Sequence, residues 1–321
     1  MPGRSTQGDL HVNVPLTNVI MAYRPEGFIA DQIAPSVNVN KKSDSYYVFS
    51  IADAHRAVDD LKAPGREANI ITRSVSSGTY NCIGRALKEP ISYEDMDNAD
   101  AANLVASRTA AAMAVKDKLL LNWEVRVGSK VFSGSNCGSY STVASAWNTA
   151  GAGNDPIGNI DTAINNVWLL TGKKPNSILF GQAAWTSFSR NSNVIDFIFG
   201  DSAVGKARVP DYGSVKALFD VERVLVAGAV KNTGGENQTA ALSRVFDDSV
   251  LVYYAPSAPS IYQPSFMYSF NWAKIKGYNW QVRVFDRPLL DEEHVQVGYY
   301  QDEKITASAL SFLIKAVNSS Q

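Results

Sequence analysis

The stretch YEDMDNADAANLVASRTAAAMAVKDKLLLN, residues 93–122, carries the strongest helix signal in the chain. Ser92 stands before it as a candidate N-cap, acidic residues fill the first turn, and no glycine or proline follows until Gly128. At ~1.5 Å per residue, a helix of this length is on the order of 45 Å long. Small and apolar residues recur on one face, namely Leu104, Ala111, Val115 and Leu119. This narrow stripe predicts close packing against a sheet.

The first fifty residues have the pattern of an extended arm. Short alternating runs at residues 11–14 and 37–39 are interrupted by Pro15, Pro25 and Pro35. Nothing in this pattern predicts a hydrophobic core of its own. We therefore expect the arm to need a neighbouring chain to become ordered.

A polar segment at residues 53–67 separates two strand-like runs, residues 46–49 and 70–80. It contains the turn residues Pro64 and Gly65 and has little apolar content, so it predicts the exposed end of a long β-hairpin. The ionisable residues clustered in it are Arg56, Asp59, Asp60, Lys62, Arg66 and Glu67.

Serine, glycine and asparagine are concentrated in residues 133–145 and 149–159, which predicts a domain boundary. Beyond it, helical patterns alternate with short strands, as in an α/β subdomain. We expect helices at residues 160–170 and 183–188, strands at 177–180 and 221–227, and a mobile loop at 231–238. The tail returns to strand character at residues 250–254, 266–274, 280–285, 295–299 and 310–317.

Composition excludes several classes of protein. The chain has 321 residues, and 45% of them are hydrophobic, which is enough to bury a large core. A formal net charge of -1 argues against a dedicated DNA-reading domain, which needs a strong basic field. No run approaches the roughly 18 apolar residues of a membrane helix, and the polar start MPGRSTQGDL lacks a signal-peptide pattern. We expect a soluble protein made in a cytoplasm.

No motif predicts an enzyme, a cofactor or a metal. Cys82 and Cys137 lack metal-ligand spacing and a nucleophile signature, so we expect two small, buried, reduced thiols, and the three histidines are scattered. Adjacent acids, Asp247 with Asp248 and residues 291–293, are expected to be solvated. The paired tyrosines predict strands packed on one face, with base stacking as a minor alternative, at Tyr46, Tyr47, Tyr253, Tyr254, Tyr299 and Tyr300.

Two glycine-rich segments invite a nucleotide-binding interpretation. In GDSAVGKA, Gly200, Gly205 and Lys206 have the spacing of a phosphate-binding loop. However, Ala207 replaces the Ser or Thr that would bind magnesium, and Pro210 interrupts the helix that should follow. The segment GAGNDPIG, residues 151–158, misses the dinucleotide spacing and is predicted to be a linker. A nucleotide-dependent enzyme remains an alternative from a different class.

The N-terminal region resembles a known family. The runs FIAD at residues 28–31, IAP at 33–35, KKS at 41–43 and YYVF at 46–49, with Val37 and Val39, resemble the arm of tailed-phage major capsid proteins. The order that follows is also similar: a charged hairpin, a long helix, an α/β region with Pro175-Asn176 before its strand, and terminal strands. The resemblance implies an α+β chain with the Hong Kong 97-type capsid fold.

That resemblance divides the chain. It implies an N-terminal arm at residues 1–45, an extended loop at 46–85, a peripheral subdomain with a spine helix at 86–147, an axial subdomain at 148–255, and return strands of the peripheral subdomain at 256–321. The tip of the extended loop, residues 53–67, would contact a neighbouring subunit. Lys62 lies in the loop that some members cross-link to an asparagine, but no partner asparagine can be matched.

The implied function is self-assembly, as pentamers and hexamers, into an icosahedral head shell around a double-stranded DNA genome. The expected partners are a separate scaffolding protein, since only about ten residues precede His11, a portal and, as a further candidate, a decoration protein. The packaged DNA would be contacted non-specifically, and the protein would belong to the virion after assembly in the host cytoplasm. An encapsulin-type nanocompartment shell, a tail tube subunit and a decoration subunit are the alternatives.

Overall fold

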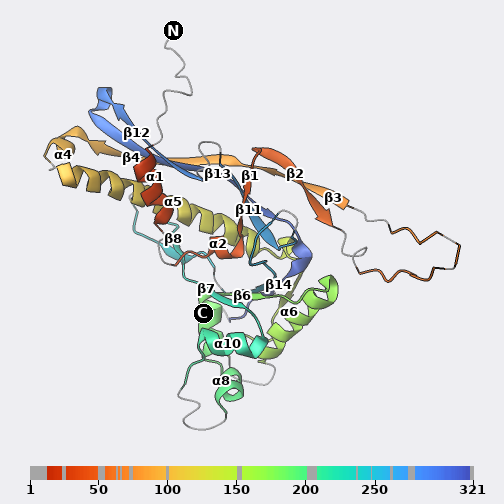
Figure 1. Cartoon of the computed structure of the whole chain (residues 1–321). Helices are drawn as coiled ribbons and strands as arrows, with labels where there is room; N and C mark the ends of the chain where they lie inside the picture. Colours follow the sequence, from red (N-terminus) through yellow and green to blue (C-terminus); the bar gives the residue numbers. More distant parts are fainter. Residues whose placement is uncertain are drawn as a thin grey trace.

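The computed structural model describes residues 13–23, 27–49, 55–62, 64–65, 67–71, 75–98, 101–149, 154–200, 208–235, 238–246, 248–260, 263–273 and 279–318. Figure 1 shows a long helix beneath one sheet and, below them, a second region of strands and shorter helices. Within the described ranges we find no candidate for a membrane-spanning helix. The mixed helix and sheet composition agrees with the predicted α+β class.

A long strand organises the first sheet. β13 (Glu292–Ile305) pairs antiparallel with β12 (Trp280–Arg287) over its first half and with β11 (Met267–Trp272) over its last residues. Its other edge pairs with β4 (Ile83–Ser92), and β1 (Ser36–Val39) adds a parallel strand beside β11. Burial along much of β13 alternates from residue to residue, which is the signature of a strand with one face on a core.

The long helix packs on this sheet, as its small-residue stripe predicted. α5 (Ala101–Val131) buries Ala111, Val115 and Leu119 in one cluster with Val295 and Val297 of β13. Small side chains let the helix lie close to the strands, so its length follows the sheet in Figure 1. The predicted sheet partner is therefore confirmed.

The boundaries of this helical region differ from the prediction. Ser92 caps a separate short helix, α4 (Tyr93–Asp97), by accepting a hydrogen bond from the Glu94 N–H at 3.2 Å. α5 then runs beyond residue 122 and includes Gly128. A Cβ at Gly128 would lie 2.9 Å from a Val245 methyl carbon, so glycine permits close packing there. That packing outweighs the low helix propensity of glycine.

A second five-stranded sheet lies below the first. Its order is β5 (Ser139–Thr142), β14 (Ser311–Lys315), β10 (Val250–Tyr253), β6 (Ser177–Gly181) and β7 (Arg223–Ala227). β6 and β10 are buried throughout, which explains their continuous apolar sequence. The segment at residues 256–321 therefore supplies strands to both sheets.

Short helices accompany the second sheet. They are α6 (Pro156–Thr171), α7 (Gln182–Ser189), α8 (Ser192–Phe199) and α10 (Tyr212–Phe219). The first two confirm the predicted helices at 160–170 and 183–188, with α6 beginning earlier because Asp155 caps it and Pro156 fits its first turn. The last two were not predicted. The described residues also contain the 3-10 turns η1 (Gly134–Asn136), η2 (Pro288–Leu290) and η3 (Ser308–Leu310).

Two hairpins form separate two-stranded sheets. β2 (Ser43–Phe49) pairs antiparallel with β3 (Val75–Asn81), which confirms the predicted hairpin but shortens its second strand, since residues 70–71 are not in a strand. β8 (Val230–Asn232) pairs with β9 (Leu242–Arg244), where the sequence predicted only a loop from residue 231. The Asn232 side chain bonds the N–H groups of Gly234 and Ala241 and so orders this turn.

The prediction of an extended N-terminal arm is wrong for residues 14–22 and 30–33. These residues form two helices, α1 (Val14–Ala22) and α2 (Ala30–Ile33), whereas β1 is extended as expected. Pro15 lies in the first turn of α1, where its missing N–H costs nothing, and Asn13 caps that turn at 3.1 Å. Leu16 and Ile20 are buried against the first sheet, so this segment contributes to the subunit core.

One hydrophobic cluster joins the two sheets. Trp123 and Val131 of α5 lie in it with Leu179 of β6, Leu251 of β10 and Phe266. The C-terminal half of the long helix is therefore packed between the two regions. This shared core therefore holds the two sheets together and sets the positions from which the β2–β3 loop and the N-terminal segment extend.

Candidate intersubunit surfaces

The predicted contact residues lie on one exposed loop beyond the β2–β3 hairpin. Figure 1 shows this loop extending away from the rest of the subunit. The side chains described in it are all exposed, namely Arg56, Asp59, Asp60, Lys62 and Glu67, while Arg66 lies outside the described residues. Asp59 links the two sides of the loop, because its carbonyl oxygen accepts a hydrogen bond from the Asn69 side chain at 2.8 Å.

The same loop exposes apolar side chains that the sequence pattern did not predict to be contact residues. Leu61 is 81% exposed, and Ile70 and Ile71 are 85% and 69% exposed. Solvent-exposed apolar side chains that lie close together indicate an interaction surface more clearly than surface charges do. Their signal in the sequence was weak, because they are scattered among charged residues.

A histidine fixes the base of the loop to the second region. The His55 Nε2–H donates to the carbonyl oxygen of Thr171, 2.8 Å away, at the end of α6. Gly172 follows with φ +66°, and a Cβ there would overlap the His55 imidazole ring. Glycine at this position therefore satisfies both the left-handed C-cap and the approach of the loop.

The N-terminal segment is held on α5 by two buried charges. Lys116 donates to the carbonyl oxygens of Ile20 and Tyr23, where α1 ends. Eight residues further along α5, Glu124 accepts hydrogen bonds from the N–H groups of Ile29 (3.2 Å) and Ala30 (2.8 Å), where α2 begins. Each charge complements the helix end that it faces.

Glu124 has an unusual environment for a carboxylate. Burial raises its pKa to about 7, although the two backbone N–H bonds oppose the shift, and the nearby negative charge of Asp31 raises it further. The folded chain therefore binds the Glu124 proton more tightly than the unfolded chain does. The contribution of protonated Glu124 to the free energy of unfolding is complete below about pH 4.5 and is lost as the carboxyl ionises and the pH rises through 7.

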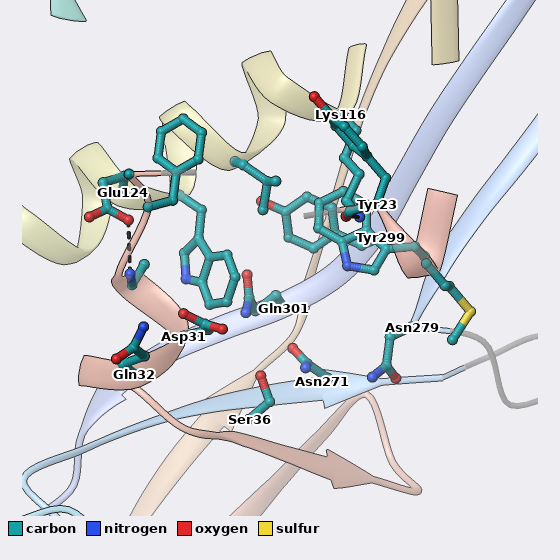
Figure 2. Close-up of a pocket in the computed structure, with 17 residues that line it drawn as sticks. Tyr23, Asp31, Gln32, Ser36, Lys116, Glu124, Asn271, Asn279, Tyr299 and Gln301 are labelled. Atoms are coloured by element: carbon teal, nitrogen blue, oxygen red, sulfur yellow. Dashed lines mark hydrogen bonds between the residues drawn. The ribbon is translucent and has the colours of Figure 1, made fainter. Parts of the chain in front are cut away.

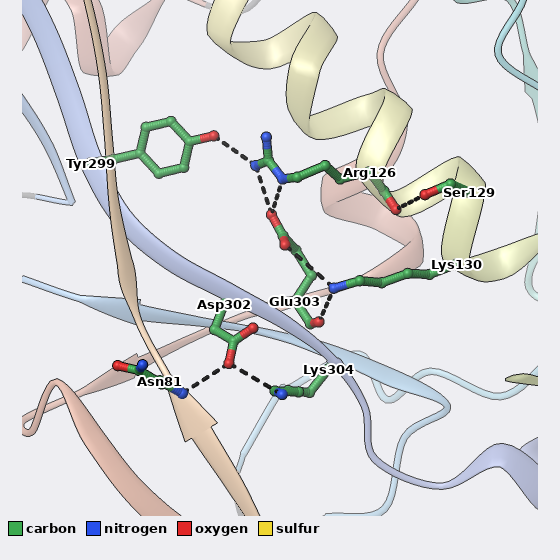
Figure 3. A network of polar contacts seen from close by, with 8 residues as sticks. All are labelled: Asn81, Arg126, Ser129, Lys130, Tyr299, Asp302, Glu303 and Lys304. Atoms are coloured by element: carbon green, nitrogen blue, oxygen red, sulfur yellow. Dashed lines mark hydrogen bonds and ion pairs between the residues drawn. The ribbon is translucent and has the colours of Figure 1, made fainter.

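A buried ion-pair network joins α5 to β13, as Figure 3 shows. Arg126 donates to Glu303 Oε1 at 2.7 Å and to the Tyr299 hydroxyl at 2.9 Å, and Lys130 lies 3.6 Å from Glu303 Oε2. Burial alone would raise the pKa of Glu303, but Arg126 and Lys130 hold it below its usual value. The ionised network positions the helix along the strand.

A second ion pair corrects the prediction that the acids at residues 291–293 are all solvated. Glu293 is buried and binds Arg108 of α5 through two hydrogen bonds of 2.6 Å. Beside it, His294 accepts from Lys88 at 2.9 Å and donates to Glu292 at 3.0 Å. Pairing with β4 and the contact with Arg108 of α5 bury Glu293, whereas the sequence alone suggested a polar turn.

The candidate enzymatic features do not converge. Gly200 ends α8 and Gly158 lies inside α6, whereas Gly205, Lys206 and Asp247 lie outside the described residues. Within the described ranges, no group of three or more His, Cys, Asp or Glu side chains could hold a metal ion. The tyrosine pairs follow the predicted alternation in part, since Tyr253 and Tyr299 are buried.

Both cysteines should be unreactive in the folded chain. Cys82 and Cys137 are free and buried, and burial raises the pKa of Cys82 to about 11, so little thiolate exists near neutral pH. We expect a colorimetric thiol reagent at pH 8 to modify neither cysteine until urea unfolds the protein, when both should react. Rapid modification of the native protein would contradict this expectation.

Sequence comparison finds relatives over nearly the whole chain. No protein-family model matches. A major capsid protein of Pseudomonas phage JBD67 is 22% identical over 308 residues, covering 95% of this chain and 96% of the relative. A major capsid protein of Burkholderia phage BcepMu is 21% identical over 266 residues, covering 80% of this chain and 82% of the relative.

Solved structures share the fold at low sequence identity. A phage-related protein from Bordetella bronchiseptica RB50 matches with a TM-score of 0.75 at 17% identity, covering 96% of this chain and 98% of that one. The capsid of cyanophage P-SCSP1u matches at 0.58 and 9% identity, covering 98% and 92%. A virus-like particle from Pyrococcus furiosus matches at 0.53 and 8% identity, covering 94% and 96%.

Both sequence relatives are named major capsid protein, and the structural matches cover both sheets and the helix between them. Matches over nearly the whole chain at low identity are expected when proteins keep a common architecture while their sequences diverge. Together these likenesses support a tailed-phage major capsid protein, and the solved structures show that the chain has the fold of phage capsids, the Hong Kong 97-type fold.

Proposed function

We propose that copies of this chain assemble into the icosahedral head shell that encloses a double-stranded DNA genome. The similarity to two phage major capsid proteins over most of the chain is the observation that carries this proposal. The exposed charged loop supports it, because ordering a long loop that adds little to its own core costs conformational entropy. Burial against a neighbouring copy would offset that cost.

In this proposal the two regions have different places in the shell. Residues 148–255, which supply β6, β7 and β10 of the second sheet with α6, α7, α8 and α10, form the axial subdomain around the five- and six-fold axes. Residues 86–147, with α5, and the return strands of residues 256–321 form the peripheral subdomain. Residues 53–67 are the tip of an extended loop that clasps a neighbouring subunit. The contact residues are Arg56, Asp59, Asp60, Lys62, Arg66 and Glu67.

The proposed partners follow from the shell. Subunits associate as pentamers and hexamers, guided by a scaffolding protein, closed by a portal and covered by a decoration protein. The packaged DNA is contacted without sequence specificity, which suits a chain with a formal net charge of -1. Assembly takes place in the host cytoplasm and the product is the virion. A capsid role argues against an enzymatic one.

The direct test is negative-stain microscopy of the overexpressed chain, with or without a co-expressed scaffold. Closed shells support the proposal, and tubes or isolated subunits contradict it. The similarity to the Pyrococcus furiosus virus-like particle supports a second candidate function, the shell of a nanocompartment that holds protein cargo. Nucleic-acid content of particles purified from infected cells separates the two, because only a genome-filled head contains DNA of one defined length.

The nucleotide-binding alternative gives a separate prediction. If residues 200–206 form only a loop, Lys206→Ala should leave assembly unchanged, and ATP should not raise the melting temperature of the wild-type chain. A ligand that binds the native state must stabilise it, by about 2.7 kcal/mol at a hundredfold excess over its Kd. An ATP-dependent rise in melting temperature that Lys206→Ala abolishes would revive the enzyme hypothesis.

A further inference from the structure

The first sheet has a hollow on each of its two faces. The larger hollow, of about 630 Å³, lies beside α5 and is drawn in Figure 2. Its buried charges, Lys116 and Glu124, already bind backbone groups at the ends of α1 and α2. The smaller hollow, of about 220 Å³, lies on the face away from α5, between β4, β12 and β13. It is the candidate for a ligand site, because its polar side chains are not used in this way.

Small residues form the floor of the smaller hollow. Val295 and Val297 of β13 pack on α5, so the half-buried Gly298 faces away from that helix. In the register of the sheet, Gly298 lies between Gln281 of β12 and Ala86 of β4. Ala86 is exposed, and glycine has no side chain. The floor is therefore open to solvent.

Hydrogen-bond donors stand beside this floor. The next row of the sheet places Arg283 of β12 opposite Gln296 of β13, and both side chains are half-buried. Neighbouring strands lie ~4.8 Å apart, so a group bound over Gly298 is within reach of both rows. The Tyr300 side chain lines the hollow on its other side. The site thus has a floor of backbone and small side chains and a wall of polar groups.

The donors of this hollow have few partners within the described residues. Arg283 donates to the Gln281 amide oxygen across 3.4 Å, which is longer than a usual hydrogen bond. Gln281 is 6% exposed, and no described group accepts from its amide nitrogen. Arg283 forms no ion pair with a described carboxylate. Because buried polar groups are nearly always paired, a ligand that accepts hydrogen bonds would complete both side chains.

The charges around the hollow favour an anion. Its described lining includes Arg283 and Arg85 and no carboxylate. Arg85 lies opposite Tyr299 in the register, so it adds a positive charge behind the floor. The acids Glu292 and Asp302 of β13 already accept hydrogen bonds from other residues. A guanidinium beside amide donors suits a phosphate group, whose oxygens accept several hydrogen bonds at once.

We propose that this hollow binds a phosphate group, with the Arg283 guanidinium and the amide nitrogens of Gln281 and Gln296 as donors. Inorganic phosphate and the phosphodiester groups of DNA share this chemistry, and two titrations distinguish them. The inference goes beyond the proposed function and does not depend on it, since the hollow is formed within one subunit.

The first experiment is a calorimetric titration of sodium phosphate into the unassembled full chain, at an ionic strength of about 0.1 M. We expect saturable binding that Arg283→Gln weakens by about tenfold or more. Arg287→Gln is the matched control, since it removes the same charge from the same strand. Arg287 is exposed and lies ~13 Å further along β12, beyond the Debye length, so the affinity should change by less than about twofold. No saturable binding, or equal losses in the two variants, would overturn the proposal.

A second variant tests the hollow itself and leaves every charge in place. Ala86→Leu puts a larger side chain beside Gly298 and should abolish measurable phosphate binding. Ala86 is exposed, so we expect the melting temperature of this variant to match that of the wild type. Phosphate binding as tight as that of the wild type would show that the anion lies outside the hollow and would contradict the proposal.

The source of the phosphate follows from a titration of fluorescein-labelled short duplex DNA at several sodium chloride concentrations. If DNA occupies the hollow, Arg283→Gln should lower the slope of log affinity against log salt by about one, because one phosphate contact is lost. If the slopes of Arg283→Gln and Arg287→Gln are equal while inorganic phosphate binds as expected, the site takes the free ion. An Arg283-dependent interaction with neither ligand would overturn the proposal.

Discussion

Replacing Glu303 with alanine should lower the free energy of unfolding by about 3 to 5 kcal/mol, the usual cost of breaking a buried ion pair. Glu303 is 2% exposed, and its loss leaves Arg126 with the Tyr299 hydroxyl as its described side-chain acceptor. The cost arises because a half-buried guanidinium can neither find a new carboxylate nor reach water fully. Urea unfolding of the unassembled chain, followed by far-UV circular dichroism, measures it.

Two comparisons separate this effect from a general loss of packing. Glu303→Gln keeps the shape of the side chain and removes its charge. Its free energy of unfolding should therefore be lower than that of the wild type near neutral pH. That deficit should fall away as the pH drops below the lowered pKa of Glu303, because the wild-type carboxyl is then also neutral. Lys41→Ala breaks an exposed pair with Asp44 and should cost less than about 1 kcal/mol. Equal losses for Glu303→Ala and Lys41→Ala would refute the buried-network account.

Elements whose pattern is set locally could be predicted from the sequence. Strands such as β6 and helices such as α6 and α7 have apolar periodicity and end signals of their own, and they lie close to the expected positions. The N-terminal helices could not be predicted in the same way. Pro15 suits either an extended arm or a first helical turn. The outcome is decided by burial of Leu16 and Ile20 against Val282, Val295 and Val297 on strands near the other end of the chain.

For the charged residues too, only part of the structure could be predicted from the sequence. Exposure of the loop charges could be predicted, because the segment has no local apolar pattern that would bury them. The buried charges Lys116, Glu124 and Glu293 do not, since their partners come from distant segments and a charge has no periodicity to reveal its burial. One signal was present in retrospect: Lys116 and Glu124 directly follow the buried residues Val115 and Trp123 on the long helix.

Deleting residues 59–66 and joining the strands by a short turn should abolish closed shells while leaving each subunit folded. The described side chains of this stretch are exposed, and the described bond that ties the loop to the second region, His55 to Thr171, lies before it. We therefore expect the free energy of unfolding to change by no more than about 1 kcal/mol. Each lost contact recurs at every copy in a lattice, so a small loss per subunit becomes a large loss per particle.

A thermal melt of the soluble deletion variant, paired with electron microscopy of the assembly reaction, tests both halves of this expectation. A same-length replacement of residues 59–66 by glycine and serine is the matched control, since it keeps the reach of the loop and removes Leu61, Lys62 and the other side chains. If side-chain contacts hold the neighbour, both variants should fail to close; if only length matters, the replacement should assemble. Stable shells from the deletion variant would refute the intersubunit clasp. A large fall in the melting temperature of that variant would show that the loop belongs to the subunit core.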